Sequence, residues 1–138
     1  RLMSYKATDL REGTLHFTNF FRYANPATDA IWLTLDGNLI NETANLPVII
    51  KQSWSHRMVV FSNNLAHVDK GVLFAMYPDP YPLGQRLFSI SQEPVRGDQE
   101  IRPLQDAKSA LNKRMANHLN LKLPAPVRRT FDMQLEGR

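Results

Sequence analysis

Short apolar runs separated by turn residues dominate the first ninety positions of the chain. The longer runs lie at 30–35, 57–61 and 72–77, and shorter ones lie at 48–50 and 86–90. These runs are rich in β-branched and aromatic residues, which favours β-strands. Apolar and polar positions alternate in 30–35, whereas 72–77 is almost continuously apolar, which predicts a strand buried on both faces.

An aromatic-rich segment at 14–23 is also expected to form a strand. Alternation holds as far as Phe17 and then slips by one position before Phe20, as in a strand that carries a bulge. Its aromatic side chains are expected in the core. Stacking on nucleic-acid bases is the alternative, but only Arg22 is interleaved with them.

Turn residues predict how these runs are joined. Asp36 and Gly37 lie between two apolar runs, which predicts a β-hairpin, because a type I′ turn needs positive φ at both central positions. Residues 69–71 predict a second turn. The segment 78–82 contains three prolines, which fix φ and remove backbone donors, so a stiff surface loop is expected there.

A helical period appears only in the last third of the chain. Apolar side chains recur at three- and four-residue spacing from Leu104 to Leu119, which predicts a helix over 104–120 that ends before Pro124. Alternation over 127–135 predicts a last strand.

These elements predict a mainly β fold in a single domain, 1–138, with 1–13 as a lead-in segment. The expected architecture is a β-sandwich or partly open barrel of seven to eight short strands, with the helix in the C-terminal region. An α+β sheet packed on that helix is the alternative.

Composition narrows the classes of protein that remain possible. With 43% hydrophobic and 22% charged residues in 138, the chain is an ordinary globular domain, expected to be soluble. It contains no cysteine, so disulfides, thiolate chemistry and cysteine-containing zinc sites are excluded. No apolar run approaches the roughly 20 residues that cross a bilayer.

The net charge of +4 is concentrated in one part of the chain. Residues 108–129 contain no acidic residue and hold six cations, which could bind phosphates. A solvated helix face is the simpler interpretation. The six are Lys108, Lys113, Arg114, Lys122, Arg128 and Arg129.

No pattern in the sequence identifies a reaction. The four histidines lack the spacing of metal ligands, no Gly-x-Ser-x-Gly motif occurs, and the six glycines are too scattered to cradle a phosphate. We therefore expect no catalytic residue, no metal and no cofactor.

The leading functional hypothesis is a non-enzymatic module that binds another protein, as a subunit or accessory domain of an assembly. The stiff proline segment is the best candidate contact, since a pre-ordered loop loses little entropy on binding. Its expected contact residues are Tyr77, Pro80, Tyr81 and Leu83. A nucleic-acid-binding module that uses the basic region, and a small enzyme whose site assembles only in the fold, are the alternatives.

Overall fold

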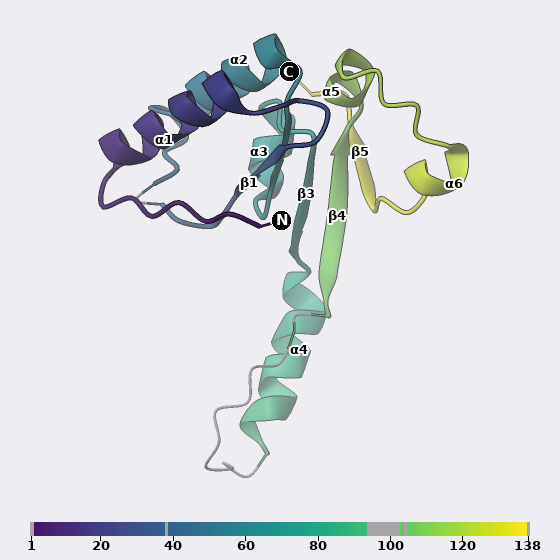
Figure 1. Ribbon diagram of the computed structural model, residues 1–138. Helices are drawn as coiled ribbons and strands as arrows, with labels where there is room; N and C mark the ends of the chain where they lie inside the picture. Colours follow the sequence, from purple (N-terminus) through teal and green to yellow (C-terminus); the bar gives the residue numbers. More distant parts are fainter. Residues whose placement is uncertain (1, 38, 94–102, 104, 138) are drawn as a thin grey trace.

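The computed structural model describes residues 2–37, 39–93, 103 and 105–137, which form an α/β fold around a five-stranded sheet (Figure 1). The strands follow each other across the sheet in chain order, with β1–β3 parallel, β4 antiparallel to β3 and β5 parallel to β4. Their bounds are β1 Ala30–Leu33, β2 Val59–Ser62, β3 Phe74–Pro78, β4 Ala107–Asn112 and β5 Met133–Leu135.

In the described parts of the chain, one helix precedes β1 and five helices lie between successive strands. They are α1 Leu10–Tyr23, α2 Leu46–His56, α3 Leu65–Asp69, α4 Pro80–Ser91, α5 Lys113–His118 and α6 Ala125–Arg128. The prediction of a mainly β sandwich or barrel is therefore wrong, because a mostly parallel sheet with helical connections replaces it. The predicted Asp36–Gly37 hairpin is wrong for the same reason: β1 and β2 are parallel, and parallel neighbours need a crossover, here α2.

Residues 14–23 belong to helix α1, not to a bulged strand. The Asp9 side chain caps the helix by accepting from the Glu12 N–H at 2.8 Å, and the Glu12 carboxylate accepts from the Thr8 N–H at 2.8 Å. The arrangement differs from a capping box in one respect, since Glu12 accepts from Thr8 and not from the N-cap residue Asp9. The slip in alternation between Phe17 and Phe20 is the three-residue spacing of a helix.

Prolines open two helices where the sequence indicated strands or loops. Pro47 lies in the first turn of α2, so the apolar run 48–50 is helical. Pro80 begins α4, and the Asp79 side chain caps it by accepting from the Tyr81 N–H at 3.3 Å. The predicted stiff loop at 78–82 is thus divided between the end of β3 and the start of α4, and the predicted strand at 86–90 lies inside α4. Proline is tolerated in the first turn because the N–H that it lacks would have no partner within the helix.

The predicted helix over 104–120 is divided in the structure. Ala107–Asn112 is strand β4, and the helix begins only at Lys113. The buried Asn112 side chain caps α5 by accepting from the Met115 N–H at 2.8 Å. Similarly, the predicted strand 127–135 is shortened to β5, because α6 ends at Arg128.

Three helices cover one face of the sheet. α1 and α2 pack over Ile31, Leu33 and Val60, and Val68 of α3 packs on the strand centres. The opposite face is only partly covered, where Met115 of α5 and neighbouring apolar side chains meet Phe74 and Leu111.

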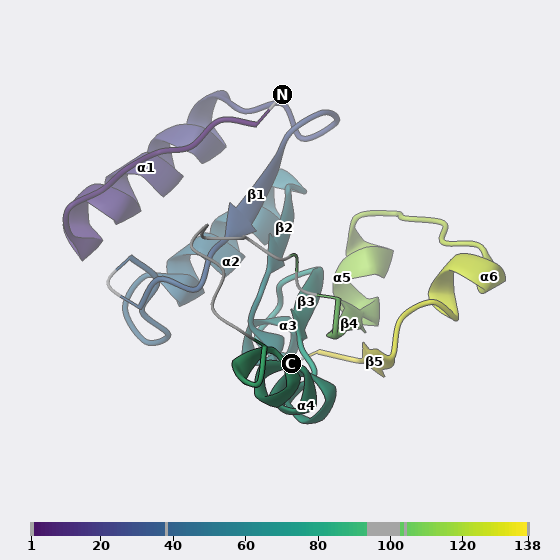
Figure 2. The same ribbon diagram turned by 90° about the horizontal axis from the view of Figure 1, so that it is seen from below.

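Helix α4 projects away from the body of the molecule and buries none of its residues (Figures 1 and 2). Its base is held by two ion pairs, Lys108–Asp79 at 2.7 Å and Arg86–Asp106 at 2.6 Å. A backbone hydrogen bond from the Asp79 N–H to the Asp106 carbonyl, 2.8 Å long, joins the chain that enters α4 to the chain that returns from it. The point where the helix leaves the sheet is therefore fixed, although none of the helix residues is buried.

Candidate functional site

Polar side chains gather where the three parallel strands end. β1, β2 and β3 run in the same direction, so Leu33, Ser62 and Pro78 lie at one edge of the sheet. In open α/β sheets, ligands commonly bind outside the carboxyl ends of the parallel strands. Asn63 and Asn64 follow β2 directly at this place.

A buried hydrogen-bond network fixes the loop after β2. The Ser62 hydroxyl and Nδ1 of His67 lie 2.8 Å apart, and both side chains are buried. The Ser62 hydroxyl also accepts from the Asn64 N–H at 3.1 Å, and the Asn64 side chain caps α3 by accepting from the Ala66 N–H at 2.9 Å. These hydrogen bonds connect the end of β2, the loop and the start of α3, so the loop backbone is held in place without a ligand.

Asn63 faces outward from this fixed loop toward β1. Its side-chain oxygen accepts from Nε1 of Trp32 at 2.5 Å. Trp32 is 48% exposed and adds a large aromatic surface beside the amide. An amide next to an exposed indole can both orient and stack a small molecule.

Burial lowers the pKa of His67, because the imidazolium form loses hydration inside the protein. The negative charge of Glu42 opposes this shift and the positive charge of Lys70 adds to it. These two charges form an ion pair with each other at 2.5 Å. The hydrogen-bond network at the strand ends therefore contains His67 in its neutral form.

Stability is consequently expected to fall as the pH falls below the unfolded pKa of histidine. At pH values between the pKa of histidine in the unfolded chain, about 6.5, and its lower pKa in the folded chain, the unfolded chain binds one proton more than the folded chain. Each pH unit in this interval therefore lowers the free energy of unfolding by at most about 1.4 kcal/mol. Urea midpoints of the chain measured at several pH values between 7 and 5 should show this loss, and His67→Gln should reduce it. An equal slope in the variant would mean that other groups cause the loss.

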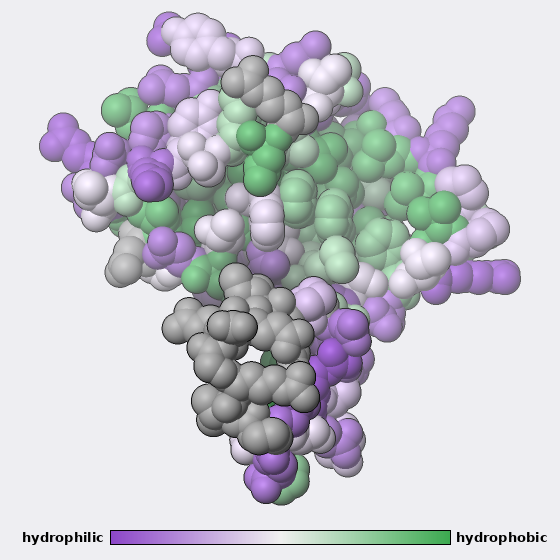
Figure 3. Space-filling view, turned by 60° about the horizontal axis from the view of Figure 1, so that its bottom comes forward, coloured by the Kyte–Doolittle hydropathy of each residue, from purple (hydrophilic) through white to green (hydrophobic). Residues whose placement is uncertain are grey.

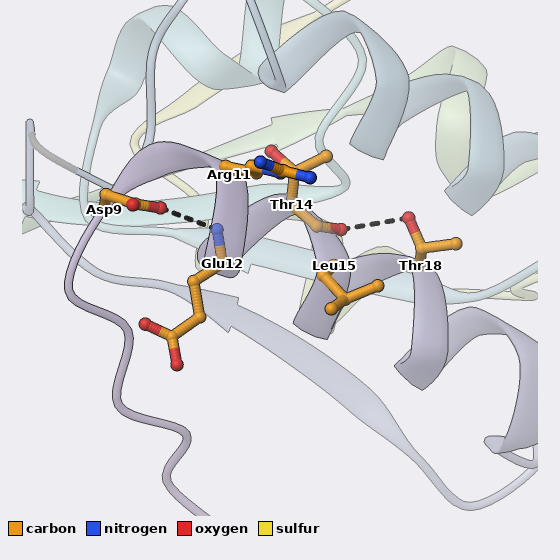
Figure 4. A pocket seen from close by; sticks show the side chains of 6 residues that line it. All are labelled: Asp9, Arg11, Glu12, Thr14, Leu15 and Thr18. Carbon is orange, nitrogen blue, oxygen red and sulfur yellow. Dashed lines mark hydrogen bonds between the residues drawn. The ribbon is translucent and has the colours of Figure 1, made fainter.

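Two hollows lie elsewhere on the surface. One, of about 610 Å³, is formed by successive turns of α1 and its cap (Figure 4). Its walls come from a single helix, so no groups from separate elements converge on it. The other, of about 800 Å³, is a groove between α2 and the β4–α5 junction, with Pro47, Trp54, Lys70 and Arg114 among its lining. Neither lies at the carboxyl ends of the parallel strands β1, β2 and β3.

The expected protein-contact residues lie at the base of α4. Tyr77 is half-buried in β3 and packs with Val68 and Ala75. Pro80, Tyr81 and Leu83 are in the first turns of α4, and the Tyr81 ring is exposed. The structure brings the last three together on one helix, and their role in contacts stays a prediction.

The six basic residues are spread over several elements. Lys108 pairs with Asp79, Lys113 pairs with Glu136, and the Arg114 guanidinium lies 5.3 Å from the centre of the Trp54 ring. The other three are exposed on or near α6: Lys122, Arg128 and Arg129. Phosphate binding by this set stays a prediction, with half of the cations already engaged inside the chain.

Sequence reasoning missed the residues at the strand ends. A signal was present, because the polar triplet at 62–64 follows an apolar strand directly.

Within the described ranges, no cluster of three or more histidine, aspartate or glutamate side chains could hold a metal ion. The described helices include none that is long and apolar enough to span a membrane.

Comparison of the sequence with protein-family models and with curated proteins finds no match. The fold is similar to solved structures, however. These include an ABC domain in complex with L-Trp from Streptococcus pneumonia (18% identity, TM-score 0.66) and a conserved domain protein from Vibrio cholerae (15%, 0.65). A third is CD0873 from Clostridium difficile, described as a ligand-free, open substrate binding protein with adhesive properties (14%, 0.63).

The chain spans less than half the length of these structures. The similarity covers 96%, 98% and 100% of this chain but only 44%, 45% and 45% of the respective structures. At these identities the likeness establishes the α/β fold alone.

Proposed function

We propose that this chain is one lobe of a two-lobe binding protein that holds a small organic ligand at the carboxyl ends of β1 and β2. The observation that carries the proposal is the fixed loop after β2, which presents the Asn63 amide beside the exposed Trp32 ring. Both groups lie at the sheet edge where α/β folds bind ligands. The apolar ring and the amide together favour a ligand with a flat or apolar part and a polar group.

Two similar structures support this proposal. One was solved with L-Trp, and another is described as a substrate binding protein. Ligand sites commonly lie between two domains, and Trp32 at the site described here is half-exposed. A second lobe would close the site.

Helix α4 supports the two-lobe arrangement. It leaves the sheet at the same edge as the site and exposes apolar side chains, among them Tyr81, Leu87 and Phe88. A helix with an uncovered apolar surface needs a packing partner. We assign that partner to the second lobe, which gives the contact residues Tyr81 and Leu83 a role in joining the lobes.

The test is an NMR titration of the isotope-labelled chain with L-tryptophan as the first probe, followed by other amino acids. A single lobe supplies only part of the contacts, so weak binding with Kd of about 1 mM is expected. Amide signals of residues 32–34 and 62–65 should shift in a saturable way. Asn63→Ala should weaken binding by about tenfold, the effect of losing one hydrogen bond to the ligand and its local orientation.

Asn19→Ala is the matched control, because Asn19 is exposed on α1 and away from the strand ends. It should leave the titration unchanged. Shifts that scatter over the surface, or that persist equally in Asn63→Ala, would contradict the proposed site.

A further inference from the structure

The sheet face opposite α1–α3 carries an aromatic row that crosses three strands. Trp32, Phe61 and Phe74 are register partners on β1, β2 and β3. The ring centres of Trp32 and Phe61 lie 6.0 Å apart and those of Phe61 and Phe74 lie 5.0 Å apart, with planes inclined by 16° and 1°. Leu111 on β4 continues the row.

This row is well covered at one end only. Phe74 and Leu111 pack with Met115 of α5, whereas Trp32 is 48% exposed and Met76, the next residue on the same face of β3, is 56% exposed. Figure 3 shows a broad apolar area on the body of the molecule next to α4. Large apolar side chains that share one exposed surface mark a contact site.

No described strand position on this face carries a charge. Such a surface offers nothing to a phosphate backbone or to an acidic partner, and it is suited to an apolar one. The positions are Ala30, Trp32, Val59, Phe61, Phe74, Met76, Pro78, Ala107, Ser109, Leu111 and Gln134.

We infer that an amphipathic α-helix from polypeptide outside these 138 residues packs on this face, with its uncharged side over Trp32, Phe61 and Met76. Sheets built on parallel strands are covered by helices on both faces, and here α1–α3 cover only one. The similar structures contain more than twice the length that this chain matches, so their polypeptide is long enough to supply such a layer. The inference goes beyond ligand binding, although Trp32 belongs both to this face and to the proposed ligand site.

The experiment uses the 138-residue chain with Trp54→Phe, so that Trp32 is the only tryptophan. The probe is an 18-residue helical peptide of leucine, alanine, glutamate and lysine, zero net charge, with its leucines along one side. A peptide of identical composition with the leucines distributed around the helix is the comparison. We expect only the first peptide to shift the fluorescence emission of Trp32 to shorter wavelength and to protect Trp32 from quenching by acrylamide.

Met76→Lys should weaken peptide binding at least about tenfold, because a charge would be buried without a partner. Met133→Lys is the matched control: Met133 is 40% exposed, but it pairs with Ala110 and so lies on the opposite face of the sheet. This variant should keep the Kd of the peptide within about twofold of the parent value, a change in binding free energy of less than about 0.5 kcal/mol. Circular dichroism verifies that both variants fold.

Equal effects of the two peptides, or no effect of either, would overturn the inference. So would a dimer in sedimentation that Met76→Lys dissociates, since the occupant would then be a second copy. None of these outcomes depends on L-tryptophan binding, so the ligand site and the helix-binding face are tested separately.

Discussion

Asn112→Ala is expected to destabilise the chain by about 3 kcal/mol, from the loss of a helix cap and of a hydrogen bond to a buried carbonyl. The Asn112 side chain is buried at the end of β4 and joins two helices. Its Nδ2 donates to the Val68 carbonyl of α3 at 2.7 Å, and its Oδ1 accepts from the Met115 N–H of α5 at 2.8 Å. Alanine leaves both backbone groups without these partners.

Urea unfolding measures this effect as a lower midpoint with an unchanged slope. Asn117→Ala is the matched control, because Asn117 is exposed on the same helix α5. Its midpoint should stay close to that of the parent chain. Equal midpoints for the two variants would show that the Asn112 contacts contribute little to stability.

Gly71→Ala is expected to destabilise the chain by a similar amount, about 3 kcal/mol, because strain and overpacking act together. Gly71 has φ +124°, a backbone conformation that residues with a side chain rarely adopt. A Cβ there would lie 2.8 Å from Cγ2 of Ile50 in α2. The turn before β3 would have to move away from the helix.

The same substitution at Gly84 is expected to act in the opposite direction. Gly84 lies inside helix α4, and a Cβ there meets no atom within 4 Å. Alanine should raise helix stability by up to about 1 kcal/mol. Thermal and urea midpoints of the two glycine variants should therefore diverge, and a loss of stability in both would contradict this account of Gly71.

The strands of the parallel half could be found from the sequence, but their pairing could not. The apolar run at 30–35 contains β1, and the runs at 57–61 and 72–77 each cover all but the last residue of β2 and β3. Periodicity identifies a buried strand without telling whether its neighbour is parallel. Asp36 and Gly37 matched a hairpin turn locally, and only the crossover through α2 shows that the following segment does not return beside β1.

Helices were missed where residues with high strand propensity fill a helical face. Val48, Ile49 and Ile50 are β-branched, yet packing of Ile49 in the core holds them in α2. The spacing of Phe17, Phe20 and Phe21 is compatible with a bulged strand as well as with a helix. The cap at Asp9 is the local feature that distinguishes the helix, which continues through Gly13 although glycine is a weak helix former.

The candidate site could not be predicted because it depends on topology. Trp32 and Asn63 are 31 positions apart and meet only because β1 and β2 are parallel neighbours in register. Ser62 and His67 are close in sequence, but their hydrogen bond requires α3, which the apolar pattern of 65–69 is too short to predict.

The order of the strands has a consequence for how the chain folds. In the described sheet each strand pairs only with the strand that precedes or follows it in the chain. Two paired strands are therefore always joined by a single connection, and no strand has to pair with one that is more distant in the sequence. The sheet can grow by the addition of one connection and one strand at a time, from β1 toward β5, so its early intermediates are expected to be shortened versions of the final sheet.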